Sequence, residues 1–142
     1  MLNEFIIEIC NLLNISIPVV SFDTSHFESS TTMAQCDSSG TTIYLRRLKR
    51  LNPDYLFSVA HELRHIWQIR TNKDAYFSNY KTVKQCKNLD EYNLQPAEID
   101  SNAFAGLIMI EFFHIKPLFS NMSKNVIAEI SKRMNVISQE FE

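Results

Sequence analysis

The feature that most constrains this chain is a helical pattern over residues 52–70, with His61-Glu62-Leu63-Arg64-His65 near its centre. Asn52 is a favourable N-cap, Pro53 suits the first helical position, and Asp54 complements the positive end of the helix dipole. Apolar residues then recur at spacings of three and four: Leu56, Val59, Ala60, Leu63, Ile66, Trp67 and Ile69. The pattern predicts one amphipathic helix with its apolar face in a core.

The two histidines of this helix are spaced for binding one metal ion. His61 and His65 stand four residues apart, so their imidazoles share one face and can converge on one ion. Glu62 is rotated by about 100° from His61, which places its carboxylate to hold a metal-bound water and not the metal. The pattern indicates a zinc hydrolase with Glu62 as general base. The alternative is two ordinary histidines beside a glutamate on an amphipathic helix.

A hydrolytic zinc site needs a third protein ligand and an open position for water. Glu98 is our candidate, because it lies on a helix expected to begin at Pro96 and to be buried, where a metal would offset the cost of an unpaired carboxylate. Asn102 shares its face and is expected to support a ligand by a hydrogen bond. Asp100 points about 200° away from Glu98 and is expected to be a first-turn dipole residue. We predict His61, His65 and Glu98 as the zinc ligands, with Asp100 as the alternative to Glu98.

Length and charge limit the class of protein. The 142 residues suit one domain spanning residues 1–142. The net charge of -2 gives no long-range attraction to nucleic acid, and the one basic cluster, residues 46–50, is short enough to be a solvated loop. Nucleic-acid binding therefore has little support.

Cysteine usage and hydropathy indicate the compartment. Three scattered cysteines without a Cys-x-x-Cys pair suit a reducing environment. Glu4 and Glu8 interrupt the N-terminal region where a signal peptide would be apolar, and Glu111 ends the most apolar internal run, residues 103–110. We expect a cytoplasmic protein that makes no contact with a membrane.

The remaining pattern predicts an α+β fold, with a small antiparallel sheet packed on the motif helix and two or three further helices. The expected elements are a helix over Leu2–Leu13, a strand over Val19–Phe22, a hairpin of strands Thr32–Cys36 and Thr41–Arg46 around Gly40, a helix from Pro96, and a last helix capped by Ser123. A weakly patterned stretch over residues 71–94 is expected to hold a short helix around Ala75–Gln85. Its tyrosines are expected to pack in the core, although one of them can instead donate to a developing oxyanion. His26 and His114 are expected to lie outside the metal site.

Two motifs together resemble a known family. His61-Glu62-Leu63-Arg64-His65 and the stretch from Glu98 to Ala105, Glu-Ile-Asp-Ser-Asn-Ala-Phe-Ala, are similar to the motifs of ImmA/IrrE-type zinc metallopeptidases. The resemblance covers residues 41–110 and implies a zincin-like fold, zinc on His61, His65 and Glu98, and a catalytic Glu62. Arg64 stands where the family has glycine, and Asp100 and Ser101 replace Glu and Ala. Such domains are bacterial or carried by phages, and several cut a repressor.

The expected function is zinc-dependent hydrolysis of a peptide bond in a protein or peptide, with zinc-bound water as nucleophile and Glu62 as base. The resemblance implies a regulatory protein such as a repressor as one substrate. An edge strand such as Thr41–Arg46 is expected to hold an extended peptide by β-augmentation. The alternative is a catalytically silent, zinc-stabilised module that binds or regulates a protein. The sequence leaves the substrate and the oligomeric state open.

Overall fold

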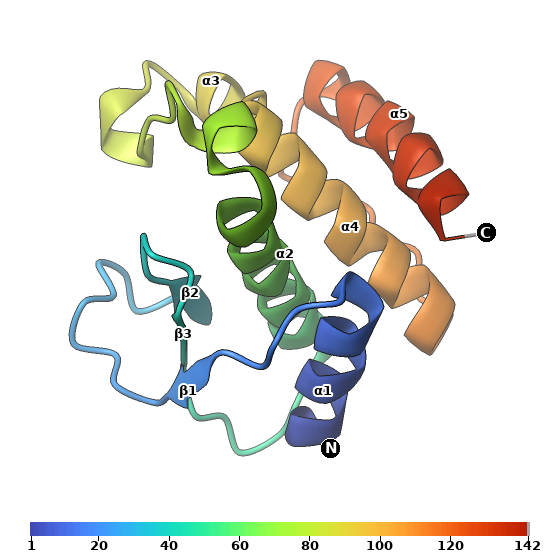
Figure 1. The fold of residues 1–142 in the computed structure, drawn as a ribbon. Helices are drawn as coiled ribbons and strands as arrows, with labels where there is room; N and C mark the ends of the chain where they lie inside the picture. Colours follow the sequence, from blue (N-terminus) through green and yellow to red (C-terminus); the bar gives the residue numbers. More distant parts are fainter. Residues whose placement is uncertain (142) are drawn as a thin grey trace. The chain divides into compact units, whose positions relative to one another are not determined.

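The computed structural model describes residues 1–141 and contains α-helices, a short 3-10 helix and a three-stranded sheet in an α+β arrangement (Figure 1). The elements are α1 (Leu2–Leu13), β1 (Val19–Ser21), β2 (Ala34–Cys36), β3 (Thr42–Leu45), α2 (Pro53–Phe77), η1 (Val83–Gln85), α3 (Leu89–Asn93), α4 (Pro96–Phe113) and α5 (Lys124–Glu140). Contacts group the chain into two compact units, Met1–Thr71 and Asn72–Glu142. The expectation that they form one domain stays a prediction.

Helix α2 begins where the sequence predicts. The Asn52 Oδ1 atom accepts a hydrogen bond from the backbone N–H of Tyr55 at 2.9 Å, which satisfies one of the donors left unpaired in the first turn. The apolar positions Leu56, Val59, Ala60, Leu63 and Ile66 are buried, as the spacing predicts. The helix continues to Phe77, beyond the predicted end, but it is interrupted at Asn72, whose φ of -159° and ψ of 65° are not helical. This break coincides with the boundary between the two units.

The sheet is mixed, with strand order β1-β3-β2. Strand β3 pairs with β2 in the antiparallel sense, as expected for a hairpin, and with β1 in the parallel sense. The prediction of an antiparallel sheet is therefore wrong for β1, because side-chain alternation is the same in both pairings and the direction is set by the connection over residues 22–33. Strand β3 is central, so the prediction that Thr41–Arg46 forms an edge is also wrong.

The turn between β2 and β3 is fixed by Gly40 and Asp37. Gly40 has a φ of 72°, which glycine adopts at little cost. Backbone N–H groups of Thr41 and Thr42 donate to Asp37 Oδ1 at 2.8 and 3.1 Å, and Ser39 Oγ donates to Oδ2 at 2.8 Å. Burial by itself would raise the pKa of Asp37, but these hydrogen bonds outweigh it and lower the pKa to about 2. The turn therefore holds Asp37 as a charged acceptor.

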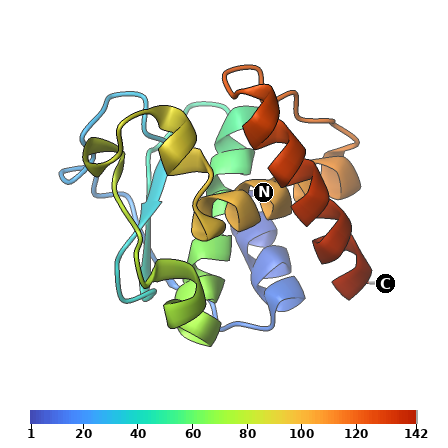
Figure 2. The ribbon, with the colours of Figure 1, turned by 90° about the horizontal axis from the view of Figure 1, so that it is seen from above.

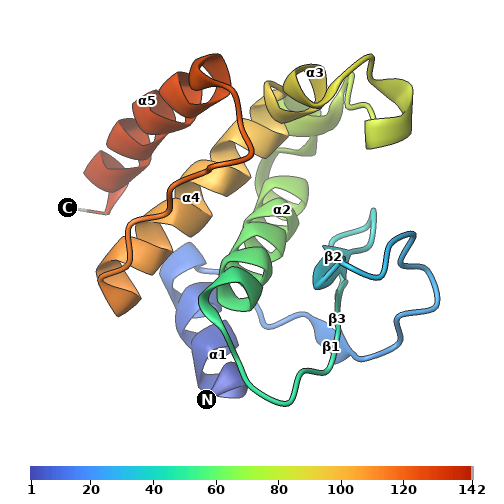
Figure 3. The same cartoon turned by 180° about the vertical axis from the view of Figure 1, so that it is seen from behind.

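Helices α4 and α5 lie side by side in the second unit (Figure 2). Pro96 occupies the start of α4, and the Ser123 Oγ atom accepts from the backbone N–H of Val126 at the start of α5, both as predicted. The segment joining the helices runs back along α4 (Figure 3). A Cβ atom on Gly106 would meet Pro117 Cγ at 3.3 Å, so the missing side chain lets this segment approach the helix closely.

The stretch between Phe77 and Pro96 differs from its prediction. No helix spans 75–85 here; the stretch holds the last residues of α2, a turn, and η1. The Gln85 side chain accepts from the backbone N–H of Thr82, and Asn88 Oδ1 accepts from the N–H of Glu91, so two local caps start new short turns in place of one helix. Within residues 1–141, the structure has no helix with the length and apolar character to cross a membrane.

Candidate metal centre

His61 and His65 form a close pair on α2. Their ring centroids are 4.6 Å apart with the rings at 85°, and the side chains are 15% and 8% exposed. The Nε2 atom of His61 lies 3.7 Å from Glu62 Oε2, and that of His65 lies 4.0 Å from the same oxygen. Both Nε2 atoms therefore lie close to one carboxylate oxygen.

Gln68 determines which nitrogen of His65 can bind a metal. The Nδ1 atom of His65 lies 2.8 Å from Gln68 Oε1, and Gln68 is fully buried. Because an amide oxygen only accepts, the proton of the neutral imidazole is on Nδ1, which leaves the Nε2 lone pair for a metal. No role for Gln68 was predicted from the sequence, although its spacing of three from His65 places it on the same helix face. Asn102, the predicted supporting residue, is buried on α4, and its role stays a prediction.

The two oxygens of Glu62 have different surroundings. Oε1 accepts a hydrogen bond of 3.0 Å from the backbone N–H of Cys36 on strand β2, while Oε2 faces the two histidines. One oxygen is thereby anchored and the other is directed to the space in front of the imidazoles. This is the geometry that a base needs if it is to hold a water beside a metal.

Arg64, between the histidines in sequence, is almost completely buried at 1% exposure. Its guanidinium carbon lies 3.7 Å from the centre of the Trp67 ring, one turn further along α2. A cation over an aromatic face is attracted to the ring, and this attraction grows when both groups are shielded from water. Trp67 is therefore one partner of the buried Arg64 side chain.

Glu98 lies in the first turn of α4 and is 2% exposed. Its Oε2 atom accepts a hydrogen bond of 2.8 Å from the Tyr80 hydroxyl, and the hydroxyls of Tyr80 and Tyr92 are 3.0 Å apart. Burial is the main cause that raises the pKa of Tyr80 well above its usual value, and the charge of Glu98 adds to it. Tyr80 is therefore a neutral hydrogen-bond donor at physiological pH.

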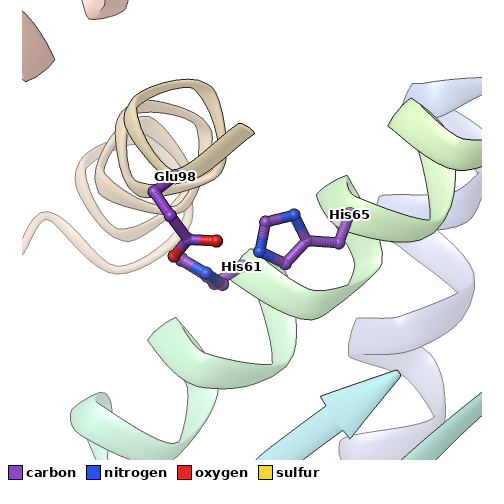
Figure 4. Close-up of side chains that lie close together, drawn as sticks. All are labelled: His61, His65 and Glu98. Atoms are coloured by element: carbon purple, nitrogen blue, oxygen red, sulfur yellow. The ribbon is translucent and has the colours of Figure 1, made fainter. Parts of the chain in front are cut away.

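In the described part of the chain, His61, His65 and Glu98 make up a group that could hold a metal ion (Figure 4). Each offers one ligand atom, and these atoms lie within 4.8 Å of one another. Two imidazoles and one carboxylate are a donor set of catalytic zinc sites, which keep a fourth position open. The donor set fits zinc, and the role of each residue as a ligand stays a prediction.

Asp100, the alternative ligand, has a different partner. Its Oδ1 atom accepts from the Arg133 Nε atom at 2.8 Å and lies 2.8 Å from a terminal guanidinium nitrogen of the same residue. The pair links α4 to α5. The prediction that Asp100 only complements the helix dipole did not include this partner. Of the two remaining histidines, His26 is exposed and lies edge-on to Tyr44, and His114 is the C-cap of α4 with a φ of 55°.

Comparison with protein-family models finds no match, and none is found among curated proteins or among solved structures. The likeness to ImmA/IrrE-type peptidases therefore rests on the two motifs in residues 61–65 and 98–105.

Proposed function

We propose that this chain is a zinc-dependent peptidase in which His61, His65 and Glu98 hold the metal and Glu62 is the general base. The observation that carries the proposal is the position of Glu62 Oε2, 3.7 and 4.0 Å from the Nε2 atoms of the two histidines, while Oε1 is held by Cys36. A structural metal site has no need of a carboxylate aimed beside its ligands, whereas a hydrolytic site does.

A zinc ion bound there would supply acidification of a water molecule and polarisation of a peptide carbonyl. Glu62 takes a proton through Oε2 and passes it to the leaving amine, and the hydrogen bond from Cys36 keeps the carboxylate from turning away. Gln68 keeps His65 in the tautomer whose Nε2 is a ligand. The base and the residue that orients His65 are thus side chains of α2, and the group that anchors the base is a backbone N–H of β2.

The outer edge of β2 is the proposed place for an extended peptide, in place of Thr41–Arg46. Met33 and Asp37 hydrogen-bond to the β3 side, so the backbone groups of Ala34 and Cys36 point to the opposite side. The N–H of Cys36 is bound to Glu62, so this edge ends at the base. A peptide that pairs along β2 would bring a backbone carbonyl close to Glu62.

The test is Glu62→Gln in the full chain. The amide oxygen of glutamine can still accept from the Cys36 N–H, so fold and zinc content should stay as in the wild type, while loss of the base lowers the cleavage rate on the order of 100- to 10,000-fold. Cleavage is measured by mass spectrometry on a mixed library of unstructured peptides. Glu129→Gln is the matched control and should cleave at the wild-type rate, because Glu129 lies on α5 with a side chain that is 40% exposed.

Equal cleavage by Glu62→Gln and the wild type would refute Glu62 as the base. A wild type that binds about one zinc per chain but cuts no peptide in the library would favour the alternative, a zinc-stabilised module that binds or regulates a protein. A wild type that binds no zinc would refute both functions.

A further inference from the structure

We propose that Tyr80 is a positioning residue that holds the Glu98 carboxylate in the orientation needed for metal binding, with Tyr92 supporting it. The inference rests on the proposed function of Glu98 as a zinc ligand and adds two residues that neither motif contains. The hydrogen bonds from which it is argued lie within the second unit.

The direction of the hydrogen bonds follows from counting protons. An ionised carboxylate can only accept, so Tyr80 donates its single hydroxyl proton to Glu98 in the bond of 2.8 Å. The contact of 3.0 Å between the two tyrosines must then be a bond in which Tyr92 donates to the Tyr80 oxygen. The three groups form a chain that runs from Tyr92 through Tyr80 to Glu98. Each bond in such a chain strengthens the next.

A second set of contacts holds Tyr80 in place. The side-chain amide of Gln95 accepts from the backbone N–H of Lys81 at 2.7 Å and donates to the Lys81 carbonyl at 2.9 Å. Gln95 is also the N-cap residue of α4, three positions before Glu98. The segment that carries Tyr80 is thereby tied to the start of the helix that carries Glu98. The backbone contacts of Lys81 with Gln95 therefore hold the Tyr80 hydroxyl beside the Glu98 carboxylate.

The sequence leaves open that one tyrosine of residues 71–94 donates to a developing oxyanion, and this arrangement argues against Tyr80 in that role. Its one hydroxyl proton is already donated in the hydrogen bond to Glu98, and an oxyanion would have to compete with that carboxylate for the same donor. The positioning role needs only the geometry that is present. A hydrogen bond to one oxygen limits rotation of the Glu98 carboxylate, so the side chain loses less conformational entropy when the metal binds.

The test is the zinc dissociation constant of the full chain, measured by competition with a chromophoric chelator. Tyr80→Phe keeps the ring, which packs 4.9 Å from Phe77, and removes only the donor. We expect zinc binding to weaken by about 10- to 100-fold, the usual effect of losing a group that orients a ligand. Tyr92→Phe should weaken it less, in the same direction.

Tyr76→Phe is the matched control. Its hydroxyl accepts a hydrogen bond of 3.2 Å from Arg133 and lies outside the chain of bonds from Tyr92 through Tyr80 to Glu98, so its removal should leave the zinc affinity unchanged. Circular dichroism of the metal-free proteins checks that each variant is folded. If Tyr80→Phe does not fold, Tyr92→Phe carries the test, and an unchanged affinity in that variant overturns the inference.

A double variant distinguishes positioning from a general loss of structure. If Tyr80 acts through Glu98, adding Tyr80→Phe to Glu98→Ala should not lower the residual zinc affinity further. An equal fold-change in both backgrounds, or wild-type affinity in Tyr80→Phe, overturns the inference while leaving the proposed function standing. A wild type that binds no zinc, or a Glu98→Ala variant with full affinity, overturns the proposed ligand set and this inference with it.

Discussion

Replacing Arg133 by methionine should destabilise the protein strongly for a substitution on a partly exposed helix. Asp100, its partner, has a side chain only 2% exposed, and both hydrogen-bonding contacts from the guanidinium are 2.8 Å long. Arg133→Met keeps a long aliphatic stem and a similar helix propensity, so the change removes the charge and its hydrogen bonds and little else.

The expected loss follows from the burial of the two partners. Removing one partner of a fully buried pair costs about 3–5 kcal/mol, because the other charge is left in a site of low polarity. Arg133 is 29% exposed, so water already screens part of the pair, and the loss should be smaller than in a fully buried one. We therefore expect the free energy of unfolding to fall by about 2–3 kcal/mol.

The assay is urea unfolding of the metal-free protein at neutral pH, read as a shift of the midpoint at constant slope. Lys132→Met is the matched control, because Lys132 is the preceding residue on α5 and its ion pair with Glu129 is open to water, with side chains 74% and 40% exposed. It should change stability by no more than about 0.5 kcal/mol. Equal losses in the two variants would refute the reasoning. Adding Asp100→Asn to Arg133→Met should recover part of the loss, since it removes the buried charge.

Three further outcomes are expected. Gly40→Ala should lower the free energy of unfolding by more than about 1 kcal/mol, because a Cβ at a φ of 72° is strained and would lie 3.0 Å from Ile69 Cγ2. A thermal melt measures this loss, and an unchanged melting temperature would contradict it. Because the pKa of Asp37 is lowered to about 2 in the folded chain, its contribution to stability should be complete above its unfolded pKa of about 3.9 and lost as the pH falls through 2; Asp37→Asn should lack this pH dependence. His61→Ala should reduce zinc content sharply from about one per chain, while His26→Ala should not, as measured by atomic emission.

The sequence determined the features that depend on neighbours a few residues apart. Helix α1 and the start of α2 were predicted from periodicity and from Asn52, because caps and i to i+4 contacts lie within one turn. The turn at Gly40 was predictable for the same reason. The shared face of His61 and His65 also follows from helix geometry alone.

Which groups far apart in the sequence meet depends on how the chain folds in three dimensions. Side-chain alternation could not show that β1 runs parallel to β3, because that depends on the path of residues 22–33. Glu62 meets Cys36 across 26 positions, and Arg133 reaches Asp100 across 33. Such pairs leave no periodic signal in one sequence, since either partner looks like an ordinary polar residue until the chain has folded and water is excluded around it.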